Sequence, residues 1–83
     1  MKQRPYKEQG EIRAFNQDVS EDELVWHRDR EDRIIDPISP TDWKFQFDNE
    51  TPVNITRLLF IPRNTYHRII KGTGDLTIRV KKL

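Results

Sequence analysis

The chain has no cysteine among its 83 residues, and it has only three glycines. The absence of cysteine excludes disulfide bonds, thiolate zinc ligands and a cysteine nucleophile. It is compatible with a reducing compartment, and we expect a cytoplasmic protein. No apolar run approaches the roughly 18 residues of a membrane-spanning helix. No apolar stretch follows residues 1–5, so a secretory signal is not expected either.

The chain also lacks a charge excess, because 15 basic and 14 acidic residues give a net charge of +1. This balance argues against a general electrostatic grip on nucleic acid, and we expect no nucleic-acid or membrane partner. Only 34% of the residues are hydrophobic, while 35% are charged. A domain this small with one apolar layer is marginally stable, so we expect a homodimer. We expect residues 1–10 to be a flexible arm and residues 11–83 to be one domain.

Hydrophobic side chains recur with the two-residue period of β-strands. Trp43, Phe45 and Phe47 alternate with polar residues, and residues 76–80 repeat the pattern. Short segments rich in Pro, Asn, Asp and Gly separate these runs and predict tight turns. The sequence therefore predicts an all-β domain of seven or eight short strands, of the barrel or sandwich type.

The two histidines of the chain both fall on predicted strands. In a strand His27 and Asp29 point to the same face, which Val25 shares, so this face is expected to point inward. His67 shares its face with Ile69. Both histidines therefore lie beside apolar partners on predicted strands.

The residues around His67 resemble the second motif of the cupin family. That motif runs Gly, five residues, Pro, one residue, Gly, two residues, His, three residues, Asn. Pro62, Asn64 and His67 occupy the Pro, second Gly and His positions. Asn suits the tight turn because it tolerates the left-handed backbone conformation. Thr56 and Lys71 stand where the family has its first Gly and its Asn.

The family's first motif is more degenerate in this chain. It runs His, one residue, His, three or four residues, Glu, six residues, Gly. His27 and Asp29 take the two His positions, Asp32 aligns with the Glu after a gap one residue shorter, and Ser39 takes the Gly position. The resemblance covers roughly residues 24–71.

The resemblance implies a small cupin-like jelly-roll barrel, also called a double-stranded β-helix, with one divalent metal inside. His27, Asp29 and His67 would be ligands, and Asp32 would be a fourth ligand or would accept an imidazole N–H. Such a ligand set suits Fe(II) and also accepts Mn, Ni or Zn. The implied function is to bind or transform a small molecule, and the sequence specifies no reaction. The chain is also similar in general appearance to short cupin-like proteins of tailed phages.

Two alternatives stay open. In the first, neighbouring arginines balance the carboxylates, and the chain is a metal-free module that binds a ligand or a partner protein; the candidates are Arg28, Arg30, Arg33 and Arg68. In the second, His27, Asp29 and His67 resemble the triad of 2-oxoglutarate-dependent Fe(II) oxygenases. Arg79 would then have to bind the cosubstrate, although the strand alternation places it on the outward face.

Two further sets of residues are predicted from the same alternation. Aromatic residues that would touch a substrate are Tyr66, Trp43 and Phe45. Apolar residues that would face outward and form a dimer contact are Trp26, Leu24 and Ile70.

Overall fold

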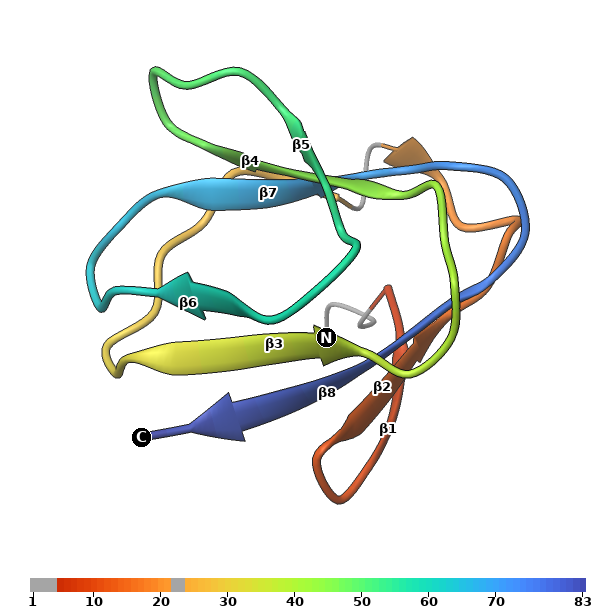
Figure 1. Ribbon diagram of the computed structural model, residues 1–83, viewed down its shortest axis with the longest axis horizontal. Coiled ribbons are helices and arrows are strands. Elements are labelled where there is room, and N and C mark those ends of the chain that lie inside the picture. The colour runs from red at the N-terminus through yellow and green to blue at the C-terminus, as the bar shows by residue number, and fades with distance from the viewer. Residues whose placement is uncertain (1–4, 22–23) are drawn as a thin grey trace.

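A computed structural model describes residues 5–21 and 24–83 (Figure 1). The regular elements are eight strands: β1 (Lys7–Gln9), β2 (Ile12–Phe15), β3 (Arg33–Pro37), β4 (Lys44–Phe47), β5 (Val53–Asn54), β6 (Leu59–Ile61), β7 (His67–Ile70) and β8 (Leu76–Lys82). The all-β class and the number of strands predicted from the sequence are therefore confirmed. Among the described residues, no helix is long and apolar enough to cross a membrane.

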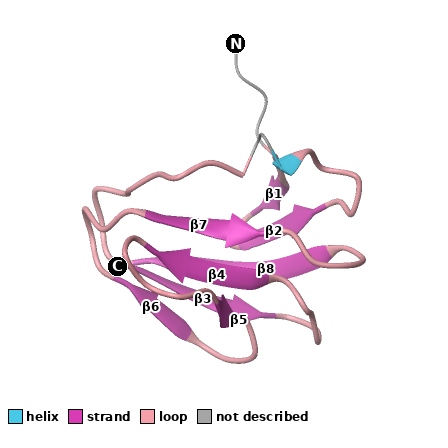
Figure 2. Ribbon diagram, turned by 90° about the horizontal axis from the view of Figure 1, so that it is seen from above, coloured by secondary structure: helices cyan, strands magenta, loops and turns pink. Residues whose placement is uncertain are grey.

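The strands form two antiparallel sheets. The larger sheet has the order β1-β2-β8-β3-β6, and the smaller sheet has the order β5-β4-β7. Figures 1 and 2 show the smaller sheet lying over the larger one, so that the inner faces of the two sheets look at each other. The core and the candidate site lie between these two layers.

The core confirms the two-residue period that the sequence shows. On β8, Leu76, Ile78 and Val80 are buried, whereas Arg79 between them is exposed. From the opposite sheet Phe45 is buried against them, and Trp43 precedes β4 with its side chain completely buried. Burying each such side chain stabilises the fold by about 1.5–3 kcal/mol.

Part of the segment expected to be a flexible arm belongs to the larger sheet. Residues 1–4 lie outside the described residues, but β1 pairs with β2 in a hairpin that turns at Gly10, whose φ is +61°. The Tyr6 ring contacts the buried Phe15 ring at 5.1 Å between centroids. The three side chains of β1 are all exposed. The strand is therefore held by backbone pairing, which leaves no apolar pattern in the sequence.

The sequence predicts a strand that carries His27 and Asp29, and this prediction is wrong, because residues 24–32 form no regular strand. Only His27 pairs, through a bridge in which His27 and His67 exchange both backbone hydrogen bonds, 3.0 and 2.9 Å long. The alternation of faces holds only in part here. Leu24, expected to face outward, packs against the core. Val25 is 50% exposed, but it lines the same cavity as His27 and Asp29, as their expected shared face predicts.

A tight turn before β7 anchors this irregular segment. Asn64 has a φ of +60°, as its place in a glycine position of the motif predicts, and its N–H donates to the Asp29 carbonyl at 2.7 Å. The neighbouring Arg63 N–H donates to the Asp32 carboxylate at 2.8 Å. The turn thus holds the backbone of Asp29 two residues beyond the His27 bridge, and both contacts come from the same stretch of chain, residues 64–67.

The backbone angle at Asn64 yields a test of this turn. We expect Asn64→Gly to change the free energy of unfolding by less than about 0.5 kcal/mol, because glycine adopts a positive φ without strain. We expect Asn64→Ala to lower it by about 1 kcal/mol, because its Cβ disfavours the left-handed conformation. Urea denaturation of both variants measures the difference. An equal loss in both would mean that the amide side chain, and not the backbone angle, holds the turn.

Candidate metal centre

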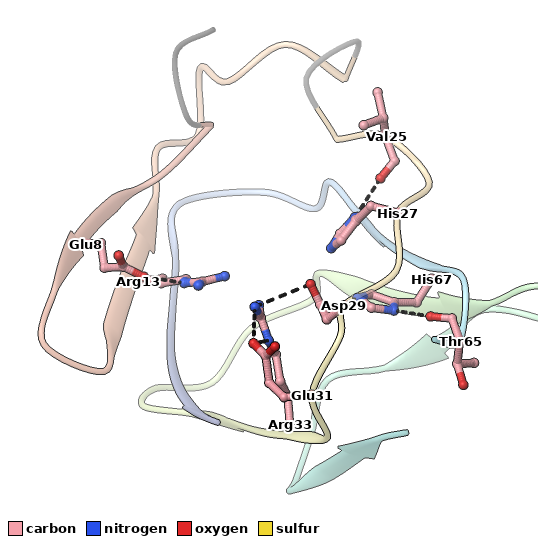
Figure 3. A network of polar contacts seen from close by, with 9 residues as sticks. All are labelled: Glu8, Arg13, Val25, His27, Asp29, Glu31, Arg33, Thr65 and His67. Carbon is pink, nitrogen blue, oxygen red and sulfur yellow. Dashed lines mark hydrogen bonds and ion pairs between the residues drawn. The ribbon is translucent and has the colours of Figure 1, made fainter. Parts of the chain in front are cut away.

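His27, Asp29 and His67 come together at the inner side of the smaller sheet. His67 is the first residue of β7, and His27 and Asp29 lie on the segment that leads into β3 (Figure 3). One ligand atom from each residue lies within 4.8 Å of the other two. Of the His, Asp and Glu side chains that the structure describes, these three alone form such a group. The structure therefore assembles the three ligands predicted first from the sequence.

Both imidazoles are oriented by a backbone carbonyl two residues earlier. Nδ1 of His27 lies 3.0 Å from the Val25 carbonyl oxygen, and Nδ1 of His67 lies 2.8 Å from the Thr65 carbonyl oxygen (Figure 3). A carbonyl oxygen can only accept, so in each ring Nδ1 must carry the hydrogen. In a neutral ring the lone pair then sits on Nε2. This arrangement prepares Nε2 to bind a metal.

His67 is neutral at physiological pH. Its side chain is 3% exposed, and burial is the main cause that lowers its pKa below the ordinary value of 6.5. The hydrogen bond to Thr65 and the Asp29 carboxylate raise the pKa, whereas the charges of His27 and Arg33 lower it. The phenyl ring of Phe45 stacks on the imidazole at 5.3 Å between centroids. The neutral form, which is the form that binds metals, is therefore favoured.

Asp29 has one carboxylate oxygen with no hydrogen-bond donor among the described residues. Its Oδ2 lies 3.4 Å from Nε2 of His67, and it is buried without a hydrogen-bond partner among the described residues. Nε2 of neutral His67 has a lone pair, so two acceptors face each other. A buried carboxylate without a partner costs several kcal/mol. A cation between these atoms would satisfy the carboxylate and both imidazoles at once.

Arg33 compensates the charge of the Asp29 carboxylate only in part. Nη2 of Arg33 lies 3.4 Å from Asp29 Oδ1, which is long for a charged hydrogen bond. Arg33 bonds more closely to Glu31, at 2.7 Å from Nη2 and 3.0 Å from Nε, and this bond is the main cause that lowers the Glu31 pKa. Asp29 Oδ2 receives nothing from Arg33.

Two of the other predicted arginines point elsewhere. The Arg28 guanidinium lies over the Tyr66 ring at 5.2 Å, and the Arg68 guanidinium lies over the Trp26 ring at 4.7 Å. Such cation–π contacts are each worth about 0.5–1 kcal/mol at exposed sites. These two arginines cover aromatic side chains and are not the counterions of Asp29.

Asp32 is not part of the cluster. Its Oδ1 accepts the backbone N–H of Arg63, and its backbone carbonyl accepts the N–H of Leu83. The three-residue step from Asp29 crosses an irregular stretch of chain, so the face on which Asp32 lies could not be derived from strand alternation. The structure gives Asp32 a place in holding the turn.

A cavity of about 590 Å³ lies in front of the cluster. His27, Asp29 and His67 line it, and so does Phe45, one of the three aromatic residues predicted to touch a substrate. Trp43 does not line it, because its ring belongs to the core and its Nε1–H donates to the Gly74 carbonyl. Tyr66 is 44% exposed and lies outside the lining.

Three charged residues of this cavity were missed from the sequence. Glu8, Arg13 and Lys82 line it. Arg13 pairs in register with the buried Ile78 and therefore shares its inward face. No local signal marks Arg13, because only the pairing of β2 with β8 determines its direction. Arg79, by contrast, is exposed and does not line the cavity, as the alternation predicts.

The three residues predicted for a dimer contact differ in their exposure. Trp26 is 40% exposed, but Leu24 packs against the core and lines the cavity, so the expectation that it faces outward is wrong. Ile70 is half-buried. The homodimer stays a prediction.

The lowered pKa of His67 predicts a pH dependence of stability in the metal-free protein. Below pH 6.5 the unfolded chain binds a proton at this residue that the native chain excludes. The free energy of unfolding should therefore fall as the pH drops below 6.5, by up to about 1.4 kcal/mol per pH unit from this residue. His67→Gln should flatten the curve between pH 6.5 and 5, measured by urea denaturation with a chelator present. Parallel curves would mean that burial does not change the titration of His67.

Comparison with known proteins identifies a structural neighbour only. No protein-family profile and no curated protein sequence matches the chain. Among solved structures, the crystal structure of protein NMB1881 from Neisseria meningitidis is similar, with a TM-score of 0.57 and 13% sequence identity. The match covers 94% of this chain and 79% of that chain. At this identity the likeness shows a shared fold and no more.

Proposed function

We propose that this chain is a small cupin-like metalloprotein that binds or transforms a small molecule between its two sheets. The observation that carries the proposal is the buried, unpartnered Oδ2 of Asp29, which lies 3.4 Å from Nε2 of His67. Together with Nε2 of His27, these atoms offer three acceptors to one point and no donor. A divalent cation is the partner that these three acceptor atoms lack.

Several features of the fold support the cupin-like part of the proposal. Two antiparallel sheets face each other, as they do in a jelly-roll barrel. The turn through Pro62 and Asn64 has the positive φ that the family's glycine position requires. His67 follows it at the start of β7 and points to the space between the sheets, where the family places its metal.

The chain itself would supply the metal ligands, the groups that orient them and the cavity beside them. Two imidazoles and one carboxylate fit Fe(II), and also Mn, Ni or Zn. Such an ion supplies Lewis acidity to a bound ligand. The carbonyls of Val25 and Thr65 hold the imidazoles, and Phe45 covers one side of His67. The cavity volume is in the range typical of small-molecule sites, about 300–1,000 Å³.

One observation favours the metal-free alternative, a module that binds a ligand or a partner without catalysis. The guanidinium of Arg33 lies within ion-pair distance of Asp29. Its shorter bonds go to Glu31, however, and they leave Asp29 Oδ2 bare. A guanidinium that already has a closer carboxylate does not explain a second, unpaired one. The metal-binding reading therefore accounts for more of the geometry.

Metal content tests the proposal directly. Elemental analysis of untagged protein, after anaerobic loading with Fe(II), Mn(II), Ni(II) or Zn(II) and removal of excess ion, should find about one ion per chain. His67→Gln and Asp29→Asn should each lose it. Asp32→Asn is the matched control and should retain it, because Asp32 accepts a backbone N–H instead of facing the cluster. No bound ion under any condition, or equal loss in Asp32→Asn, would contradict the site.

The Asp29 carboxylate predicts that Asp29→Asn changes the free energy of unfolding in opposite directions without and with bound metal. Without metal, Asp29→Asn should raise the free energy of unfolding by about 1–3 kcal/mol, because an amide N–H that can donate to His67 replaces a buried oxygen that has no partner. With saturating metal, wild type should become the more stable protein, since ligand binding to the native state stabilises by mass action. Thermal and urea denaturation with chelator and with metal measure both. A metal-free Asp29→Asn protein less stable than wild type would show that Arg33 already balances the charge.

A further inference from the structure

The charged side chains in the cavity and directly beside it are equal in number when no metal is bound. Two carboxylates, Glu8 and Asp29, line the cavity with three cations, Arg13, Arg33 and Lys82. Glu31 lies just outside the lining, pairs with Arg33 and has its pKa lowered in part by Lys82. With Glu31 included, positive and negative charges are equal. A divalent ion at the proposed site therefore adds two positive charges that no described side chain of this group compensates.

Arg13 is placed to meet a compensating anion. Its side chain is only 13% exposed, and Figure 3 shows its guanidinium reaching from β2 into the interior, toward Arg33. Nε donates to Glu8 at 2.8 Å, and the guanidinium lies 4.5 Å from the centre of the Tyr6 ring. These contacts hold the stem of the side chain and aim the end of the guanidinium at the cavity. Arg13 pairs with Glu8 and Arg33 pairs with Glu31, so any further positive charge in the cavity would lack a counterion.

The remaining wall of the cavity is apolar. Side chains from both sheets contribute, and they include Phe15, Ile61, Ile69 and Ile78. An apolar wall with a few convergent polar groups is typical of sites for small organic molecules. A free inorganic ion would leave this wall in contact with water, whereas an organic anion would cover it.

We infer that the ligand of this cavity is a small organic carboxylate, with its carboxylate on Arg13 and its apolar body against Phe15 and Ile78. The inference rests on the proposed metal site, because the metal supplies the charge that the ligand balances. Arg13 is accordingly a specificity-determining residue. A carboxylate accepts two parallel N–H bonds from one guanidinium, which a neutral amide of the same shape cannot match in strength.

Isothermal titration of Mn(II)-loaded protein with benzoate and with benzamide tests the inference. Benzoate should bind at least about tenfold more tightly than its neutral isostere. Because benzoate could also bind the metal, the decisive comparison is between variants. Arg13→Gln should weaken benzoate about tenfold and leave benzamide unchanged, and Arg13→Lys should restore part of the loss.

Arg79→Gln is the matched control, because Arg79 lies on the neighbouring strand β8 of the same sheet but is exposed on its outer face. It should change neither affinity. Metal content and circular dichroism of each variant establish that the site and the fold persist. Benzoate binding that is no tighter than benzamide binding, or that Arg13→Gln leaves unchanged in metal-loaded protein, overturns the inference while the metal site stands. A wild-type chain that takes up no metal overturns the proposed function, and the inference with it.

Discussion

A buried carboxylate oxygen that faces an imidazole lone pair is the constraint around which this small protein is arranged. Asp29 Oδ2 and the Nε2 atoms of His27 and His67 are all acceptors, and the fold gives this group no donor among the described residues. Left alone, such a group opposes folding by several kcal/mol. The fold nevertheless builds it firmly. Backbone carbonyls hold both rings, and the N–H of Asn64 holds the Asp29 carbonyl. Structure that is costly by itself and well supported by its neighbours is typical of a binding site.

The segment that carries His27 and Asp29 also connects the two sheets. It leaves β2 of the larger sheet, pairs with β7 of the smaller sheet at His27, and returns to the larger sheet at β3. A metal bound to His67 and Asp29 would therefore link β7 of the smaller sheet to the segment that leads into β3 of the larger sheet. Because the chain has few hydrophobic residues, its core is small, and such a link would add to the stability of the fold.

The arginines of this nearly neutral chain fall into two groups, one outside the cavity and one inside it. The guanidinium groups of Arg28 and Arg68 lie over the rings of Tyr66 and Trp26, away from the cavity. Arg13 and Arg33 enter the cavity, each with a carboxylate beside it. Positive and negative side chains in and beside the cavity are thus equal in number. A divalent ion at the proposed site would add two positive charges to this set, and the proposed anionic ligand would offset part of them.

The sequence by itself determined the all-β class, the inward faces of β4 and β8, the left-handed turn at Asn64 and the three residues of the cluster. The all-β class and the inward faces follow from alternation over a few residues. The turn at Asn64 and the three cluster residues follow from the resemblance of two short segments to family motifs. Tertiary structure decided the rest. The hairpin of β1 depends on backbone pairing that has no apolar signature, and the directions of Leu24 and Asp32 depend on an irregular segment fixed by distant partners. Arg13 became a cavity residue only through its register with Ile78, which lies 65 residues further along the chain. Contacts between strands so far apart cannot be read from the pattern within either strand.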